Sequence, residues 1–214
     1  MGWRLAPGTG YCEVEGELVF LDLGRDRYFS LRGEDRTAFE RLRRGEANDR
    51  DASSRLIGTR LIERSAGEHD LAPTALTVPP EDLTTRDARF DVRAALSASR
   101  SLYWARRAMR PHRIAATVAA LARRKRACSF RDAEASAIAV HYAACRWATP
   151  IPPRCLIDSL ALDHILVRRG ISAALVFGVR LHPFAAHCWL QTSHHILTGT
   201  AADAHNFTPI LVVA

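Results

Sequence analysis

Residues 152–162 read Pro-Pro-Arg-Cys-Leu-Ile-Asp-Ser-Leu-Ala-Leu, and they open the last long helix that the sequence predicts. The two prolines disfavour helix, whereas apolar residues recur at helical spacing from Cys155 to Arg169, where Gly170 ends the pattern. Cys155 therefore lies in the first helical turn. Unpaired N–H groups and the positive end of the helix dipole favour a thiolate there and can bind an oxyanion. The alternative is that Cys155 is a small buried hydrophobic residue, as free cysteines commonly are.

The end of the chain after this helix is rich in strand patterns. Apolar, branched or alternating residues predict strands over Ser172–Arg180, Ala186–Thr192, Ile196–Thr198 and Phe207–Val213. His187 lies in the second of these strands, with Trp189 on the same face. A strand histidine that faces a cysteine at the start of a helix has the geometry of a thiolate–imidazolium pair, although a lone strand histidine is more commonly structural. Cys155 and His187 are therefore the candidate catalytic pair.

The first 71 residues have a different pattern. Strand compositions cover Tyr11–Val14, Leu18–Leu23 and Arg27–Leu31, and helical spacings cover Glu34–Arg44 and Ser53–Ile62. This predicts a small three-stranded sheet followed by two helices. Residues 72–85 hold three prolines without an apolar period, which is typical of a linker. We therefore expect one domain over residues 1–71 and a second over residues 86–214.

The second domain is predicted to begin with helices. Helical patterns cover Phe90–Met109, Pro111–Leu121 and Asp132–Trp147, and Asp132 or Ser129 is the expected cap of the third. Together with the strand-rich end, these helices predict an α+β fold. A small sheet with helices comes first, and a domain of N-terminal helices and a C-terminal antiparallel sheet follows.

The composition is that of a globular protein. The chain has 214 residues, of which 48% are hydrophobic and 25% charged. No stretch approaches the roughly 20 apolar residues that cross a bilayer, and the N-terminus lacks the apolar core of a signal peptide. The five cysteines are odd in number and include no CxxC pair, which disfavours a disulfide framework and structural zinc. We therefore expect a cytoplasmic protein that does not enter a membrane.

The net charge of +7 is unevenly distributed. Residues 1–80 hold 12 Arg and 14 Asp or Glu, whereas residues 81–214 hold 18 Lys or Arg and 9 Asp or Glu. Most of the excess lies between Arg86 and Arg126. Such a region is compatible with nucleic-acid binding, with a solvated helix face or with a dock for an acidic protein. Nucleic-acid binding is the least favoured, because the strand–helix unit that would resemble a winged helix is net acidic, and we expect no nucleic-acid partner.

The residues around the candidate pair resemble a known family. The similarity runs over Arg154-Cys155-Leu156, Ser159-Leu160-Ala161-Leu162, Arg169-Gly170, Val176-Phe177-Gly178-Val179-Arg180, Pro183-Phe184 and His187-Cys188-Trp189. These segments look like the transglutaminase-like leader peptidases of lasso-peptide biosynthesis, called lasso-peptide B proteins. The resemblance implies a transglutaminase- or papain-like fold. It also implies a cysteine peptidase, with Cys155 as nucleophile and His187 as base, that removes the leader from a ribosomal precursor peptide.

The N-terminal unit is similar to the small PqqD-like, winged-helix-like domain that binds leader peptides. The similarity rests on Leu21-Asp22-Leu23 and Tyr28-Phe29-Ser30-Leu31. It implies that the leader adds as a strand to a sheet edge, for which Arg27–Leu31 is the expected strand. The expected substrate-binding residues are Tyr28, Phe29, Leu31, Arg154, Phe184 and Trp189. The alternative for Tyr28 and Phe29 is a role in the core and the sheet alone.

The third catalytic member departs from the family pattern. An aspartate that orients the imidazole usually follows the histidine by about twelve residues, and Gly199 occupies that position here. Asp203 is the nearest carboxylate, so we expect Asp203 to take this role. The alternatives are Gln191, Asn206, a backbone carbonyl or a bare Cys–His dyad.

No metal or cofactor is expected. The chain has a group of neighbouring candidate ligands, but none of its pairs has the spacing of standard zinc ligands: His182, His187, Cys188, His194, His195 and His205. There is no glycine-rich phosphate loop. The resemblance implies two partners, the precursor peptide held by its leader and an asparagine-synthetase-like lasso cyclase, which would use the ATP of the pathway. The alternative function is a non-catalytic leader-binding scaffold for that cyclase.

Overall fold

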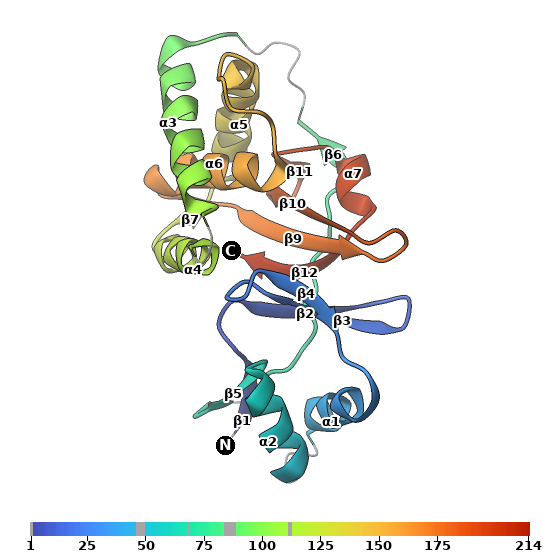
Figure 1. Ribbon diagram of the computed structural model, residues 1–214. Coiled ribbons are helices and arrows are strands. Elements are labelled where there is room, and N and C mark those ends of the chain that lie inside the picture. The colour runs from blue at the N-terminus through green and yellow to red at the C-terminus, as the bar shows by residue number, and fades with distance from the viewer. Residues whose placement is uncertain (1, 46–49, 68, 84–88, 111–112) are drawn as a thin grey trace.

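A computed structural model describes residues 2–45, 50–67, 69–83, 89–110 and 113–214 (Figure 1). The first part holds a three-stranded antiparallel sheet of order β2-β3-β4 and a separate antiparallel pair of β1 with β5. Its elements are β1 (Gly2–Leu5), β2 (Thr9–Val14), β3 (Glu17–Asp22), β4 (Arg27–Ser30), α1 (Gly33–Arg43), α2 (Arg50–Thr59) and β5 (Ile62–Ser65). The predicted three-stranded sheet and two helices are confirmed, whereas β1 and β5 are not anticipated by the sequence patterns.

The middle strand β3 is buried on both faces, which explains its continuous apolar composition. Leu18 and Phe20 lie in a core with α1 and α2, where Phe20 stacks on Tyr11 with ring centroids 5.1 Å apart. Val19 and Leu21 lie in the larger core, which also holds residues of α3, α4, α5 and α6. The first sheet is therefore a layer between its own helices and the rest of the molecule.

The second part has the predicted order of helices followed by a sheet. Its elements are β6 (Glu81–Asp82), α3 (Val92–Ala108), α4 (Ile114–Lys125), β7 (Ser129–Phe130), α5 (Asp132–Arg146), α6 (Cys155–Arg168), β8 (Ile171–Ser172), β9 (Ala174–Arg180), β10 (Ala185–Gln191), β11 (His195–Ile196), α7 (Ala201–His205) and β12 (Thr208–Val213). The main sheet has the order β12-β9-β10-β11-β6, antiparallel except for the parallel pair of β11 with β6. The predicted α+β fold is confirmed. None of the helices in the described ranges combines the length and apolar composition that a membrane crossing needs.

One predicted helix start falls outside the described residues, and the predicted cap of another helix is wrong. The prediction that α4 begins at Pro111 falls on residues 111–112, outside the described ranges, and α4 itself begins at Ile114. The predicted cap of α5 is wrong, because Asp132 is its first helical residue and the N-cap is Arg131, without a side-chain bond. The Asp132 carboxylate instead accepts a hydrogen bond from the hydroxyl of Ser193.

The described part of the predicted linker lies against both sheets. The N–H of Thr74 donates to the carbonyl oxygen of Tyr11 over 3.0 Å, and its hydroxyl donates to the carbonyl oxygen of Ile210 over 2.7 Å. Further along, Glu81–Asp82 forms β6 at the edge of the main sheet. The division into residues 1–71, 72–85 and 86–214 stays a prediction, but the connecting segment is a packed part of the fold.

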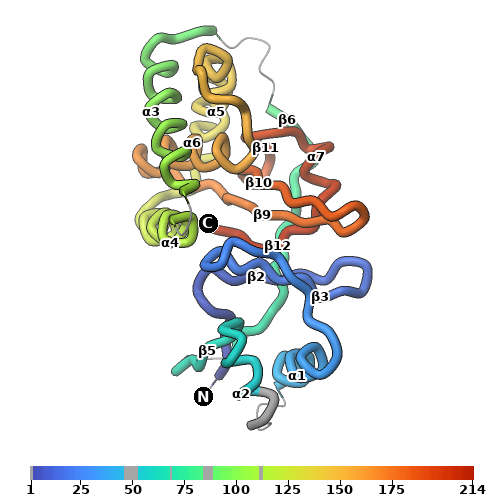
Figure 2. Tube along the Cα trace, in the orientation of Figure 1, coloured from blue at the N-terminus to red at the C-terminus, as the bar shows by residue number. Residues whose placement is uncertain are grey.

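The first sheet lies next to β12 (Figure 2). At Gly10 of β2, an added Cβ atom would lie 2.1 Å from the carbonyl oxygen of Ile210 in β12, so only glycine permits this approach. The same packing brings Tyr28 of β4 against Phe184, with ring centroids 5.6 Å apart. The edge strand of the first sheet is thereby held close to the segment that leads into β10.

Candidate active site

Cys155 is the first residue of α6, as predicted, and its side chain is exposed. Arg154 before it has an extended backbone, with φ −145° and ψ 128°, and provides no side-chain cap. A side chain of the helix itself stabilises the helix start instead. Oδ2 of Asp158 accepts a 2.9 Å hydrogen bond from the N–H of Arg154. The N–H groups of Cys155 and Leu156 belong to the first turn, where no carbonyl one turn earlier can accept from them. They are available to an oxyanion.

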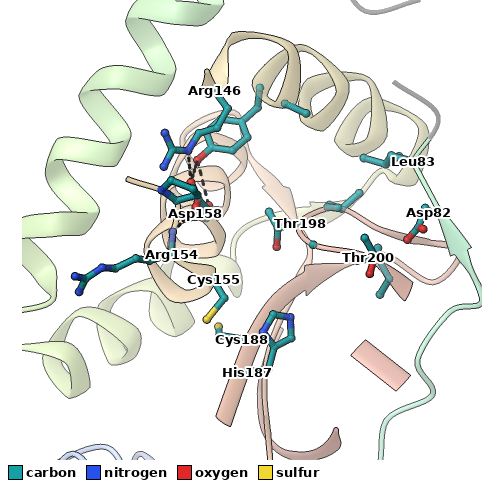
Figure 3. Close-up of a pocket in the computed structure, with 16 residues that line it drawn as sticks. Asp82, Leu83, Arg146, Arg154, Cys155, Asp158, His187, Cys188, Thr198 and Thr200 are labelled. Carbon is teal, nitrogen blue, oxygen red and sulfur yellow. Dashed lines mark hydrogen bonds and ion pairs between the residues drawn. The ribbon is translucent and has the colours of Figure 1, made fainter. Parts of the chain in front are cut away.

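The Asp158 carboxylate is neutralised by its neighbours. It forms an ion pair with Arg146 and accepts a 3.1 Å hydrogen bond from the hydroxyl of Tyr142 (Figure 3). Burial, with the charge of Asp158 adding to it, raises the pKa of Tyr142, so its hydroxyl keeps its proton. Because the negative charge is shared with Arg146, it opposes a thiolate at Cys155 less than a free carboxylate would.

His187 lies in the middle of β10, opposite Gly178 of β9. Its imidazole is half-buried between two aromatic rings, Trp189 at a centroid distance of 5.8 Å and Phe207 at 5.1 Å. Burial lowers the pKa of His187, and the charge of Asp203 only partly opposes that effect. The imidazole is therefore neutral near neutral pH, which is the state of a general base.

Cys155 and His187 line one cavity of about 580 Å³. In Figure 3 the Cys155 side chain extends from the start of α6 toward His187 and Cys188. Burial raises the pKa of Cys188 well above its ordinary value, and a charge on Cys155 adds to the rise. Cys188 is therefore a neutral thiol, and Cys155 is the exposed sulfur of the cavity.

Hydroxyl groups tie the helix of Cys155 to the strand of His187. Ser159, one turn after Cys155, lies 3.2 Å from the carbonyl oxygen of Cys188 as donor and 2.8 Å from the hydroxyl of Thr198. The Thr198 hydroxyl in turn accepts from the N–H of Leu190 over 2.9 Å. These bonds fix the distance between α6 and β10, and with it the relative position of the thiol and the imidazole.

The predicted orienting carboxylate acts on the imidazole through its charge and forms no hydrogen bond with it. Asp203 is in α7, and its Oδ2 accepts a 2.8 Å hydrogen bond from the hydroxyl of Thr200. Within the described residues, Nε2 of His187 is buried and has no hydrogen-bond partner. A Cβ atom at Gly199 would lie 3.5 Å from that nitrogen. The role of Asp203 stays a prediction, and its influence on His187 in this structure is through its charge.

The side-chain alternatives to Asp203 are engaged elsewhere. Oε1 of Gln191 accepts a 2.7 Å hydrogen bond from the indole N–H of Trp189, and its Nε2 donates to the carbonyl oxygen of Thr77. The amide of Asn206 donates to the carbonyl oxygen of Ala202 over 2.9 Å. Neither of these side chains bonds His187, whose ring contacts the rings of Trp189 and Phe207.

The predicted substrate-binding residues fall into two groups. Arg154 lines the cavity, and the exposed Phe184 contacts Tyr28. Burial raises the pKa of Tyr28, so its hydroxyl keeps its proton. The other group faces the interior. Leu31 and Trp189 are buried, and the half-buried Phe29 stacks on Phe20 at 5.7 Å. For this second group the structure offers packing roles rather than an open surface.

The histidines beyond His187 do not gather around one point. His182 lies near Glu15, His194 near Asp132 and His195 near Glu81. In the part of the chain that the structure describes, no group of three or more His, Cys, Asp or Glu side chains could hold a metal ion.

Sequence reasoning missed several residues of the cavity. Arg146, Tyr142 and Asp158 come from two helices, and Thr198 from the segment after β11. Asp158 carries the one available signal, since an acidic residue in the first turn is typical of a helix start. The others are joined only by tertiary packing, which no local spacing indicates.

A family model described as the Transglutaminase-like superfamily matches residues 95–212. The matched span is more than half of the chain. It runs from α3 into β12 and contains Cys155, His187 and the other residues of the cavity that come after the linker. No significant match was found among curated proteins or among solved structures.

Proposed function

This chain belongs to the transglutaminase-like superfamily, and we propose that it is a cysteine peptidase with Cys155 as nucleophile and His187 as general base. One observation carries the proposal. A thiol in the first turn of α6 and a neutral, half-buried imidazole on β10 line a single cavity. The superfamily fold is of the cysteine-peptidase type, which agrees with this reading of the site.

The proposed reaction is acyl transfer to water. His187 takes the proton of Cys155, and the thiolate attacks the carbonyl carbon of the scissile peptide bond. The N–H groups of Cys155 and Leu156 hold the oxyanion of the tetrahedral intermediate. His187 then gives the proton to the leaving amine, and water hydrolyses the thioester with His187 as base again.

Two arrangements of the third member fit this reaction. In the first, Asp203 stabilises the imidazolium that forms in the transition state through its charge, across the position of Gly199. In the second, Trp189 and Phe207 alone hold the ring, and the site is a dyad. Substitution of Asp203 separates them, because an orienting aspartate contributes orders of magnitude to the rate.

The proposed substrate is the leader-bearing precursor of a lasso peptide. The resemblance to lasso-peptide B proteins supports this, and so does the outer edge of β4, which pairs with none of the described strands beyond β3. A leader added to this edge would pass Tyr28, which contacts Phe184, three residues before His187. The backbone pairing of strand addition would hold the leader while the junction with the core peptide enters the cavity.

The proposed partner is an asparagine-synthetase-like cyclase that closes the ring on the new amino terminus. In this proposal the ATP of the pathway is used by that partner, and the chain itself is cytoplasmic and needs no cofactor. The second candidate function is a leader-binding scaffold for the cyclase without peptidase activity. The vacancy at Gly199, where the family pattern expects a carboxylate, favours it.

We expect a short precursor peptide to be encoded next to the gene of this chain, and the test is cleavage of that peptide. The purified chain is incubated with this peptide, with and without the cyclase, and the products are identified by mass spectrometry. We expect release of the leader by the chain and loss of activity in Cys155→Ala and His187→Ala. Cys128→Ala is the matched control, because Cys128 is a half-buried thiol outside the cavity.

Leader removal by Cys155→Ala would overturn the peptidase assignment. Binding of the precursor without cleavage by the chain, even with the cyclase present, would favour the scaffold. Loss of cleavage in Cys128→Ala as well would show that cysteine substitution damages the protein in general. The loss in Cys155→Ala would then not identify a nucleophile.

A further inference from the structure

A further hollow adjoins the catalytic cavity at Tyr142, which lines both, and a second hollow adjoins the first. Their volumes are about 240 and 370 Å³, and they share Ser97, Ile165 and Arg169 as lining residues. The walls come from α3, α5 and α6, and α6 is the helix that begins with Cys155. The two hollows therefore form a continuous depression next to the catalytic cavity.

Four arginines line this depression, which we call the basic groove: Arg93, Arg100, Arg168 and Arg169. All four are exposed. Across the described residues, none of their guanidinium groups forms an ion pair with a carboxylate. Asp91 is the one carboxylate in the lining, and its Oδ1 accepts a 2.8 Å hydrogen bond from the backbone N–H of Arg93 as the cap of α3.

The surroundings of the groove increase its positive potential. α3 carries four arginines and neither Asp nor Glu. Ser101, which lines the second hollow, has its hydroxyl 3.3 Å from Nδ1 of His164. Burial, with the charges of Arg168 and Arg124 adding to it, lowers the pKa of His164 to about 4. An anionic group in the groove would meet four unpaired guanidinium groups and little competing negative charge.

Exposed apolar side chains lie on the same helix as two of these arginines. Val92 and Leu96 lie one turn apart on α3 and are each 63% exposed, next to Arg93 and Arg100. A surface that alternates arginine with exposed aliphatic residues fits a polypeptide that mixes carboxylates with apolar side chains. It fits a nucleic acid less well, because the phosphate backbone offers no aliphatic groups for Val92 and Leu96.

We propose that the basic groove binds an acidic segment of the substrate polypeptide and so acts as a second binding site beside the catalytic cavity. This rests on the proposed function, since a peptidase substrate extends beyond the residues at the cleaved bond. The guanidinium groups would pair with Asp or Glu side chains. The groove would then increase the affinity for the substrate without taking part in the chemical step.

The test measures binding without cleavage. The probe is a short fluorescein-labelled peptide in which Glu alternates with Ala and Leu, and the protein is the full chain carrying Cys155→Ala. We expect anisotropy to report saturable binding that weakens as salt is added. Arg100→Ser with Arg168→Ser should weaken this binding by about tenfold. The matched control is Arg106→Ser with Arg123→Ser, which removes the same charge from exposed residues outside the groove and should change binding less than about twofold.

Equal weakening in both double variants would overturn the proposal, because net charge alone would then explain the binding. Tighter binding of a single-stranded DNA oligomer or of anionic lipid vesicles, lost in the Arg100 and Arg168 variant, would also overturn it in favour of another ligand. The probe needs no catalysis, so the two proposals fail separately. Probe binding by Cys155→Ala, together with no precursor cleavage by the natural chain, would disprove the peptidase and leave the groove. Precursor cleavage by the natural chain, together with no probe binding by Cys155→Ala, would disprove the groove and leave the peptidase.

Discussion

Gly199 stands against the imidazole of His187, so that a Cβ atom added to it would lie 3.5 Å from Nε2. This nitrogen is buried and, within the described part of the chain, accepts and donates no hydrogen bond. The backbone of Gly199 has φ +80°, a conformation in which Asp and Asn are better tolerated than other side chains. A side chain at position 199 would therefore begin in van der Waals contact with the base.

A carboxylate at this place should strengthen the base. We expect Gly199→Asp to raise the pKa of His187, because a negative charge next to Nε2 stabilises the imidazolium. In the proposed mechanism, kcat/KM for precursor cleavage should rise by about tenfold, and the acid limb of its pH profile should move to higher pH. Gly199→Ala is the control, since it carries the same backbone strain without the charge. Equal effects of the two substitutions would show that the place has no electrostatic role.

The pH dependence of the natural chain should reflect a buried imidazole. Burial lowers the pKa of His187, so activity should fall on the acid side only below the usual histidine pKa of about 6.5. Asp203→Asn removes the charge that opposes this effect and keeps an oxygen that can accept from Thr200. The acid limb should then move to still lower pH, by less than about one unit, with less than about tenfold loss of rate. A loss of several orders of magnitude would instead establish Asp203 as the orienting member of a triad.

The edge of β4 should matter through its backbone. Leu31 donates its N–H to the carbonyl oxygen of Leu18 in β3, so in the antiparallel register the N–H of Ser30 points outward. Ser30→Pro should remove one outward donor while the bonds to β3 remain, because proline is tolerated on edge strands. We expect affinity for the precursor, measured by anisotropy with Cys155→Ala, to fall by about tenfold. Ser30→Ala keeps the N–H and should bind as the natural chain does. Unchanged binding by Ser30→Pro would exclude strand addition at this edge.

An ion pair inside the molecule should hold the catalytic helix to the sheet. Nζ of Lys125 lies 2.9 Å from Oδ1 of Asp163 in α6, and both side chains are fully buried. The same ammonium donates to the carbonyl oxygens of Ala173 and Val213, over 2.6 and 2.8 Å. Asp163→Ala leaves this charge unpaired and should lower the free energy of unfolding by about 3–5 kcal/mol in urea titrations. Asp163→Asn, which keeps an acceptor, should lower it less. A change below about 1 kcal/mol in Asp163→Ala would mean that the lysine escapes to water or loses its proton easily.

The parts of the fold that the sequence predicts are those with strong local patterns. Leu18–Leu23 is mostly apolar because β3 is buried on both faces. The helix of Cys155 begins there because prolines precede it, and Gly170 marks its end. The pairing of β1 with β5 has no such local pattern in the sequence. It joins residues 2–5 to residues 62–65, and neither stretch alternates enough to stand out.

The candidate site shows the same difference between residues that local patterns indicate and residues that only tertiary packing brings together. Its two reacting groups follow from their positions at a helix start and in a strand. The partners of those groups depend on packing between distant segments, as when Tyr142 and Arg146 of α5 meet Asp158 of α6. Asp203 lies in α7, a helix of five residues that is too short for a helical period, and its bond to Thr200 could not be foreseen from spacing.

The most direct measurement of the central claim is identification of the acyl-enzyme. The chain is mixed with its precursor peptide in a single turnover, quenched with acid and digested, and the modified residue is located by mass spectrometry. We predict the leader joined as a thioester to Cys155 and absent from Cys155→Ala and His187→Ala. A leader attached to another residue, or cleavage that proceeds in Cys155→Ala, would contradict the assignment of Cys155 as the nucleophile.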